Sequence, residues 1–185
     1  MMRIFSAALV ALILAGCGGQ PQRFDLPPLP APEPVAVSTS SLEIREVSLP
    51  LYASQEIIYY QGENGALVFD DSLLWADDPR RAFTEGLADA LSARTRARIA
   101  AEPWPFYDQP ESRLEVRFNR ALPGSDGQYR LSGQYFVASS EEGGRQVSGT
   151  FALTEPYDPD QLGTIPVAKA RLISRLADQI ARQAL

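Results

Sequence analysis

The sequence predicts a single α/β domain of the α+β type, in which a mixed, mainly antiparallel sheet of about five to six strands packs against two main helices. Segments within residues 42–69 and 114–153 alternate apolar and polar side chains, as half-buried strands do. Residues 79–91 and 172–180 instead repeat apolar side chains at helical spacing. The chain of 185 residues suits one core, because domains usually hold roughly 100 to 200 residues.

The first 17 residues have the order of an export signal that ends in a cysteine. A basic start is followed by an uncharged apolar run and two small residues before Cys17. The apolar run is shorter than the roughly 20 residues that a membrane-spanning helix needs. Residues 14–17, Leu-Ala-Gly-Cys, resemble a bacterial lipobox, which implies a signal peptide over residues 1–16 and lipid attachment at Cys17. An ordinary signal peptide that ends at an accidental cysteine is the alternative.

Residues 17–41 are predicted to be a lipid-bearing, proline-rich tether ahead of the domain at 42–185. Prolines recur through residues 21–34 and favour polyproline II at about 3.1 Å per residue, so we expect a spacer. A disordered terminus with no length requirement is the alternative. Two or three acyl chains on Cys17 would hold the protein durably on a bilayer. In similar lipoproteins an Asp after the cysteine favours the inner membrane; Gly18 stands here, so we expect the periplasmic face of the outer membrane.

Composition excludes several classes of function. The chain has no histidine and a single cysteine, which removes Ser-His-Asp and Cys-His catalysis, zinc sites built on His or Cys, and disulfides. Without the signal peptide, 16 basic and 23 acidic side chains remain, a net charge of −7. Nucleic acid binding draws on a positive surface, so it is not expected. We expect no catalytic residue, no metal and no cofactor.

Turn and cap signals separate the predicted elements. Two β-rich runs, residues 57–60 and 66–69, flank an Asn-Gly pair, which indicates a hairpin because both residues tolerate positive φ. An Asp-Asp-Pro sequence at 77–79 then begins a helix, where an acidic cap before proline is typical. For Asp77 and Asp78, a metal or acid/base role is the alternative to capping.

A proline-bounded aromatic segment, residues 103–110, separates this helix from a three-stranded meander. Three large aromatic side chains between prolines are hard to bury, and interfaces favour aromatics. We therefore expect Trp104, Phe106 and Tyr107 to form a partner-binding surface, with core packing as the alternative. Trp75, where the hairpin meets the helix, is expected in the core, with partner contact as the alternative.

The order of these features resembles a known family. A lipobox, a hairpin, a Leu-Trp-Ala motif at 74–76, strands from Leu114 to Val137 and a C-terminal helix are similar to the ABC-type transport auxiliary lipoproteins, the PqiC/YmbA-like family. The resemblance covers about residues 42–185, and a short aromatic-x-Leu segment at 24–26 is also similar. It implies a non-enzymatic accessory subunit of an envelope system in which an MCE-domain protein and ABC transporter subunits move lipids between two membranes. Homo-oligomerisation is left open.

Three classes of function are compatible with these residues. The first is an adaptor that docks a partner through its sheet or aromatic segment, while its acyl chains anchor it in the membrane. The second is a carrier that itself shelters an acyl chain, which needs an apolar cavity of roughly several hundred Å³. The third is an enzyme that uses paired carboxylates at Asp77, Asp78, Asp158 and Asp160.

Overall fold

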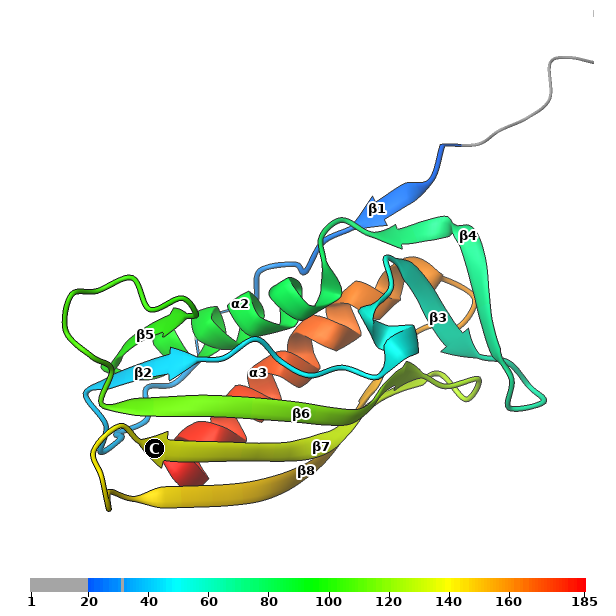
Figure 1. Ribbon diagram of the computed structural model, residues 1–185. Helices are drawn as coiled ribbons and strands as arrows, with labels where there is room; N and C mark the ends of the chain where they lie inside the picture. The colour runs from blue at the N-terminus through cyan, green and yellow to red at the C-terminus, as the bar shows by residue number, and fades with distance from the viewer. Residues whose placement is uncertain (1–19, 31) are drawn as a thin grey trace, which may run out of the picture.

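The computed structural model describes residues 20–30 and 32–185, which form two sheets and two long helices in one domain (Figure 1). The elements, in chain order, are β1 (Gln22–Phe24), β2 (Ser41–Ile44), η2 (Leu51–Ser54), β3 (Ile57–Gln61), β4 (Leu67–Trp75), α2 (Pro79–Ser92), β5 (Arg98–Ala101), β6 (Ser112–Pro123), β7 (Gln128–Ser139), β8 (Gln146–Pro156), η3 (Leu162–Thr164) and α3 (Ile165–Ala184). The predicted α+β class and the two main helices are confirmed.

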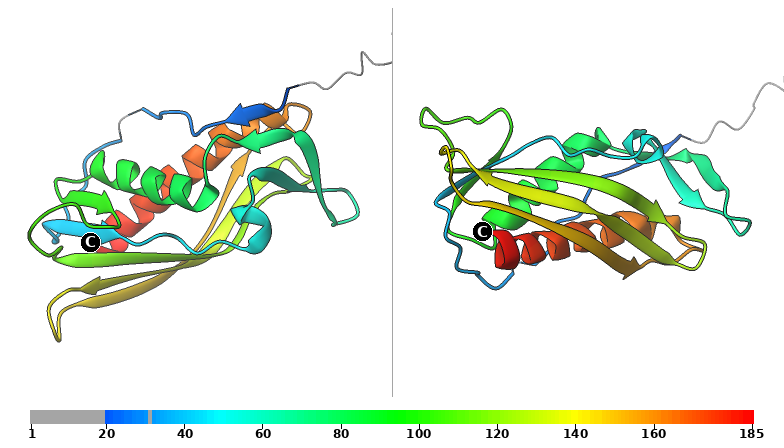
Figure 2. Two further views of the ribbon diagram at one scale, coloured as in Figure 1. Left: turned by 45° about the horizontal axis from the view of Figure 1, so that its top comes forward. Right: turned by 60° about the horizontal axis from the view of Figure 1, so that its bottom comes forward.

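The larger sheet has the strand order β5-β2-β6-β7-β8. Strand β2 runs parallel to both of its neighbours, whereas β6, β7 and β8 form the expected antiparallel meander. Helices α2 and α3 pack across one face of this sheet (Figure 2). The core between helices and sheet includes Leu42, Phe83, Leu87, Leu91, Leu114, Val116, Leu131, Tyr135, Leu172, Leu176 and Ile180.

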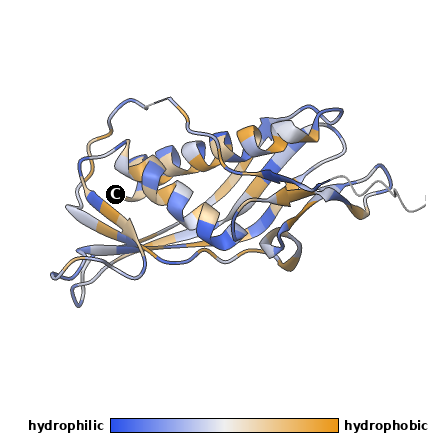
Figure 3. Cartoon of the chain, turned by 90° about the horizontal axis from the view of Figure 1, so that it is seen from above, coloured by the Kyte–Doolittle hydropathy of each residue, from blue (hydrophilic) through white to orange (hydrophobic). Residues whose placement is uncertain are grey.

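Both helices are amphipathic, and α2 begins at Pro79, where the sequence predicts. Apolar and polar positions follow one another along each helix in Figure 3, and apolar residues such as Phe83 and Leu176 are buried. The Asp78 carboxylate accepts hydrogen bonds from the Arg80 and Arg81 backbone N–H groups at 2.8 and 3.2 Å, so it caps α2. Pro166 lies in the first turn of α3, where its missing N–H costs nothing.

The smaller sheet has the order β1-β4-β3. Strands β3 and β4 form the predicted antiparallel hairpin, and Gly65 in its turn has a φ of 81°, which glycine adopts without strain. Strand β1 pairs in parallel with the far end of β4, so that Phe24 lies opposite Trp75. The strands thus divide between two sheets instead of one, because no pairing in the described residues joins β3 or β4 to the larger sheet.

The proline-rich segment differs from the free spacer that its composition predicts. Residues 22–30 and 32–38, which we call the strap, pack along the domain. Besides β1, the Val35 N–H donates to the Arg94 carbonyl at 2.7 Å and the Ser38 N–H donates to the Leu185 carbonyl at 2.6 Å. The physical reason is that apolar side chains between the prolines pack on the core; these are Phe24, Leu26, Val35 and Val37.

Candidate functional site

The aromatic loop, residues 103–110, projects from one end of the domain between β5 and β6 (Figure 1). Trp104 is half-buried at its base. The Phe106 side chain is 41% exposed and Tyr107 is fully exposed. The loop therefore brings the three predicted aromatic residues together and turns two of them toward solvent.

Charged and polar contacts order this loop. The Arg98 guanidinium lies over the Phe106 ring, 4.6 Å from its centroid, and forms an ion pair with Asp108. The hydrogen bond from Arg98 holds the pKa of the Asp108 carboxyl below its usual value. The Trp104 indole N–H donates to the Asp108 carbonyl at 2.6 Å, and its backbone N–H donates to Glu43 Oε1 at 3.1 Å. These contacts thus hold the Trp104 and Phe106 rings in place in the free protein.

Trp75 lies inside the domain, where β4 leads toward α2. Its side chain is 7% exposed, so it offers almost no surface to a partner. The ring instead faces Lys169, whose Nζ atom lies 3.9 Å from the Trp75 centroid and 4.2 Å from that of Phe83.

Lys169 is a polar residue that the sequence reasoning missed. It is the only lysine of the chain, and it is 1% exposed on α3. Burial lowers its pKa to about 7, while the charges of Asp77, Asp25 and Asp78 act in the opposite direction. Its position, three residues before Leu172, places it on the apolar stripe of the helix, and that spacing is the signal that would have found it.

Three of the four carboxylates considered for catalysis are engaged in turns and caps. Asp78 caps α2, and Asp77 forms an ion pair with Arg81 at 2.6 Å. Asp158 accepts hydrogen bonds from the Asp160 N–H and from Gln161 Nε2, at 2.9 and 2.8 Å. Within residues 20–30 and 32–185, no group of acidic side chains is arranged to hold a metal ion.

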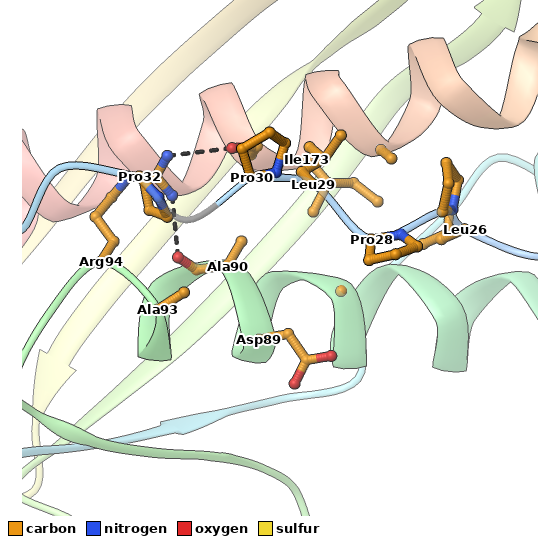
Figure 4. A pocket seen from close by; sticks show the side chains of 14 residues that line it. Leu26, Pro28, Leu29, Pro30, Pro32, Asp89, Ala90, Ala93, Arg94 and Ile173 are labelled. Carbon is orange, nitrogen blue, oxygen red and sulfur yellow. Dashed lines mark hydrogen bonds between the residues drawn. The ribbon is translucent and has the colours of Figure 1, made fainter.

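A groove of about 370 Å³ lies between the strap and the two helices (Figure 4). Its strap side carries Leu26, Leu29 and four prolines. Its floor consists mainly of small residues of α2 and α3, among them Gly86, Ala90, Ala93 and Ala170. The groove is thus apolar along most of its length.

Arg94 closes one end of the groove. Its side chain is buried and donates to the Ala90 carbonyl at 3.0 Å and to the Ser174 hydroxyl at 3.1 Å, and its Nε atom lies 3.3 Å from Asp178 Oδ1 (Figure 4). The Arg94 charge is therefore engaged by groups of the domain itself. Cys17, the predicted lipid attachment residue, lies outside the described residues. Among the helices of the described ranges, none has the length and apolarity to span a membrane.

Comparisons with known proteins agree with this architecture. An uncharacterised protein of known crystal structure has a TM-score of 0.70 at 20% identity, over 89% of this chain and 98% of that one. A protein from Xanthomonas campestris, of family DUF330, has a TM-score of 0.59 at 15% identity, over 88% and 91%. The PelC dodecamer from Paraburkholderia phytofirmans has a TM-score of 0.46 at 13% identity, over 82% and 91%.

At these identities the first two structural neighbours show a shared fold and no more. No curated protein matches the sequence. A family model does match: it is described as the ABC-type transport auxiliary lipoprotein component, and it covers residues 24–181, from the strap into the last turn of α3. That family is one of transport auxiliary components and not a class of enzymes. The chain therefore belongs to the ABC-type transport auxiliary lipoprotein family.

Proposed function

We propose that this lipoprotein is anchored through a lipidated Cys17 at the periplasmic face of the outer membrane, and that it acts there as the adaptor of an MCE-type ABC lipid-transport system. In this role it contacts an MCE-domain protein and transporter subunits, carries out no catalysis, needs no cofactor or metal, and does not bind nucleic acid. Self-association is compatible with the same role. The single observation that supports the adaptor best is the ordered aromatic loop.

The loop has the composition and the rigidity of a binding hot spot. Aromatic and arginine side chains contribute most of the energy at many interfaces, and here Phe106 and Tyr107 are presented with Arg98 beneath Phe106. Ordering a flexible side chain on binding costs roughly 0.5–1.5 kcal/mol. The ion pair between Arg98 and Asp108 reduces that cost, because it orders the loop in the free protein.

The adaptor is tested with the full-length lipoprotein and an MCE-domain protein of the same organism. The double variant Phe106→Ala, Tyr107→Ala should bind the partner about tenfold more weakly or worse, since two exposed aromatic hot spots are removed. Leu51→Ala is the matched control, because Leu51 is 80% exposed but lies outside the loop. Failure of the unaltered protein to retain an MCE-domain partner would refute the adaptor.

The anchor is tested separately. In the unaltered protein, mass spectrometry should find a diacylglyceryl and an amide-linked acyl group on Cys17, and membrane fractionation should recover the protein with the outer membrane. Cys17→Ala should leave it soluble in the periplasm or unprocessed. Recovery of the lipidated protein in the inner membrane would contradict the proposed location while leaving the anchor intact.

The carrier is the second candidate, and the groove beneath the strap favours it. A volume of about 370 Å³ is in the range of roughly 300–1,000 Å³ that small-molecule sites occupy. If the domain carries lipid, extraction of the purified protein should release non-covalent phospholipid, and Ala90→Phe should abolish that release by filling the groove. Ala152→Phe, on the exposed face of β8, is the control. Purified protein without extractable lipid would exclude the carrier.

A further inference from the structure

Large apolar side chains are exposed at two places in the described part of the chain. Two of them, Phe106 and Tyr107, belong to the aromatic loop. The others are Leu67 and Phe69 on β4, at 41% and 52% exposure, and Leu51 on η2, the short helix packed against β3. Figure 1 and both views of Figure 2 show the β3–β4 hairpin and the aromatic loop at opposite ends of the molecule.

The apolar residues of the hairpin form one surface. Tyr59 on β3 lies opposite Phe69 on β4 in the strand register, and their rings meet edge to face with centroids 5.4 Å apart. Leu67 follows on the same side of β4, two residues from Phe69, because strand side chains alternate between faces. We call Tyr59, Leu67 and Phe69 the hairpin patch.

The chain enters the domain beside this hairpin. Gln22, at the start of β1, pairs with Leu73, in the part of β4 that follows the hairpin. Cys17 stands five residues before Gln22, so the covalent chain confines it within roughly 18 Å of that residue. Phe69 stands four residues before Leu73, about 13 Å along a strand. The length of the chain therefore allows Cys17 to reach the neighbourhood of the hairpin.

We propose that the hairpin patch rests in the headgroup region of the bilayer that holds the lipidated Cys17, so that the aromatic loop points away from that membrane. This inference rests on the proposed lipidation of Cys17. Because the anchor already holds the protein at the bilayer, the contact between the hairpin patch and the lipid forms at a high effective concentration. A contact of small apolar area is then sufficient. An aromatic pair and a leucine suit the interface, where apolar side chains lie beside polar headgroups.

Charge complementarity indicates the kind of lipid surface. Glu63, Asp70 and Asp71 lie on the hairpin, and hydrogen bonds from Ser72 lower the pKa of Asp70, so that it stays ionised. Anionic headgroups would repel this end of the molecule, whereas zwitterionic headgroups would not. The favoured surface is thus rich in zwitterionic phospholipid.

The test places a probe at each end of the full-length lipoprotein. Since lipid occupies the thiol of Cys17, Leu67→Cys or Tyr107→Cys introduces the only free thiol, which is labelled with an environment-sensitive fluorophore. Each protein is reconstituted in phosphatidylethanolamine–phosphatidylcholine vesicles with or without a lipid-borne quencher. At Leu67 we expect a blue-shifted emission that the quencher suppresses; at Tyr107, the matched control, we expect neither. Replacing zwitterionic by anionic lipid at low salt should reduce quenching at Leu67.

The outcomes separate this inference from the proposed anchor. If the protein fails to float with the vesicles, the anchor fails and this inference fails with it. If the protein floats but the Leu67 probe is quenched no more than the Tyr107 probe, only this inference is overturned. A blue-shifted emission of the Leu67 probe that the lipid quencher does not suppress, and that persists in detergent, would indicate a second copy or another protein on the hairpin patch. That result would also overturn this inference.

Discussion

The Nζ atom of Lys169 lies 3.9 Å from the centroid of the Trp75 ring, inside the domain, where β4 leads toward α2. The ring face attracts the ammonium charge, and Phe83 does the same from 4.2 Å. Burial opposes this attraction, since it removes water from the charge and lowers the pKa of Lys169 to about 7. The junction between the small sheet and the helices thus contains a group that titrates near neutral pH.

The first prediction concerns stability and pH. The pKa of Lys169 falls from its ordinary value of 10.5 to about 7 on folding, so between those values the unfolded chain binds the extra proton. This group therefore adds stability as pH rises from about 7 toward 10.5. Lys169→Met lacks that contribution, so its unfolding free energy relative to the unaltered protein should be highest below pH 7 and decline above it. Urea unfolding at about pH 6 and about pH 9 measures this difference; parallel pH profiles of the two proteins would contradict it.

The second prediction concerns the cap of α2. Asp78→Ala removes the acceptor for the Arg80 and Arg81 N–H groups and should lower the unfolding free energy by about 1 kcal/mol. Asp78→Asn keeps a capping oxygen and should cost much less. Chemical denaturation provides the comparison. A loss of transport function in either variant without a loss of stability would revive a chemical role for this carboxylate.

The third prediction concerns the strap. A Cβ atom at Gly86 would lie 3.3 Å from Leu26 Cδ1 and 3.4 Å from Ile173 Cδ1, so a long side chain there must displace the strap. Gly86→Met should speed tryptic cleavage after Arg23 while circular dichroism shows the fold retained. Gly86→Ala requires shifts of only a few tenths of an ångström and is the control. Equal cleavage rates in Gly86→Met and the unaltered protein would show that the strap is not held there.

The fourth prediction concerns the approach of β6 to β7. A Cβ atom at Gly133 would lie 2.1 Å from the Arg117 carbonyl oxygen and 2.9 Å from Phe118 Cα, both backbone atoms. Gly133→Ala should therefore cost about 3 kcal/mol, the upper end of overpacking, and lower Tm by roughly 10 °C. Gly62→Ala is the control, because its Cβ would make only ordinary contacts, with Val68 at 3.4 Å and the Ala66 carbonyl oxygen at 3.7 Å. Calorimetry that finds equal Tm values for the two variants would contradict the prediction.

The local signals in the sequence predicted local structure well. The Asn-Gly pair at 64–65 identified the hairpin, Asp78 identified the start of α2, and alternation from Leu114 onward identified the meander. Each signal depends on a few neighbouring residues, so no knowledge of the rest of the fold was needed. The class of the fold followed from the number and order of these elements.

Features that depend on distant partners could not be predicted in the same way. Strand β1 has three residues, too few to show a period, and its partner β4 lies some 50 residues further along the chain. The prolines around Phe24 and Leu26 suggested a spacer, although these two side chains pack on the core. The groove exists only because the strap lies across two helices. The exposure of Phe106 and Tyr107 was expected, but the contact of Arg98 with the Phe106 ring was not.

The strap has a mechanical consequence. With Cys17 in a membrane as proposed, tension between the anchor and a bound partner would reach the domain first at Gln22, the start of the three-residue strand β1. Release of β1 and of the strap as far as Ser38 would free about 16 residues, or roughly 50 Å of extended chain. The protein would then have two working heights above the membrane, a short one at rest and a long one under load, and the strength of the β1–β4 pairing would set the force that separates them.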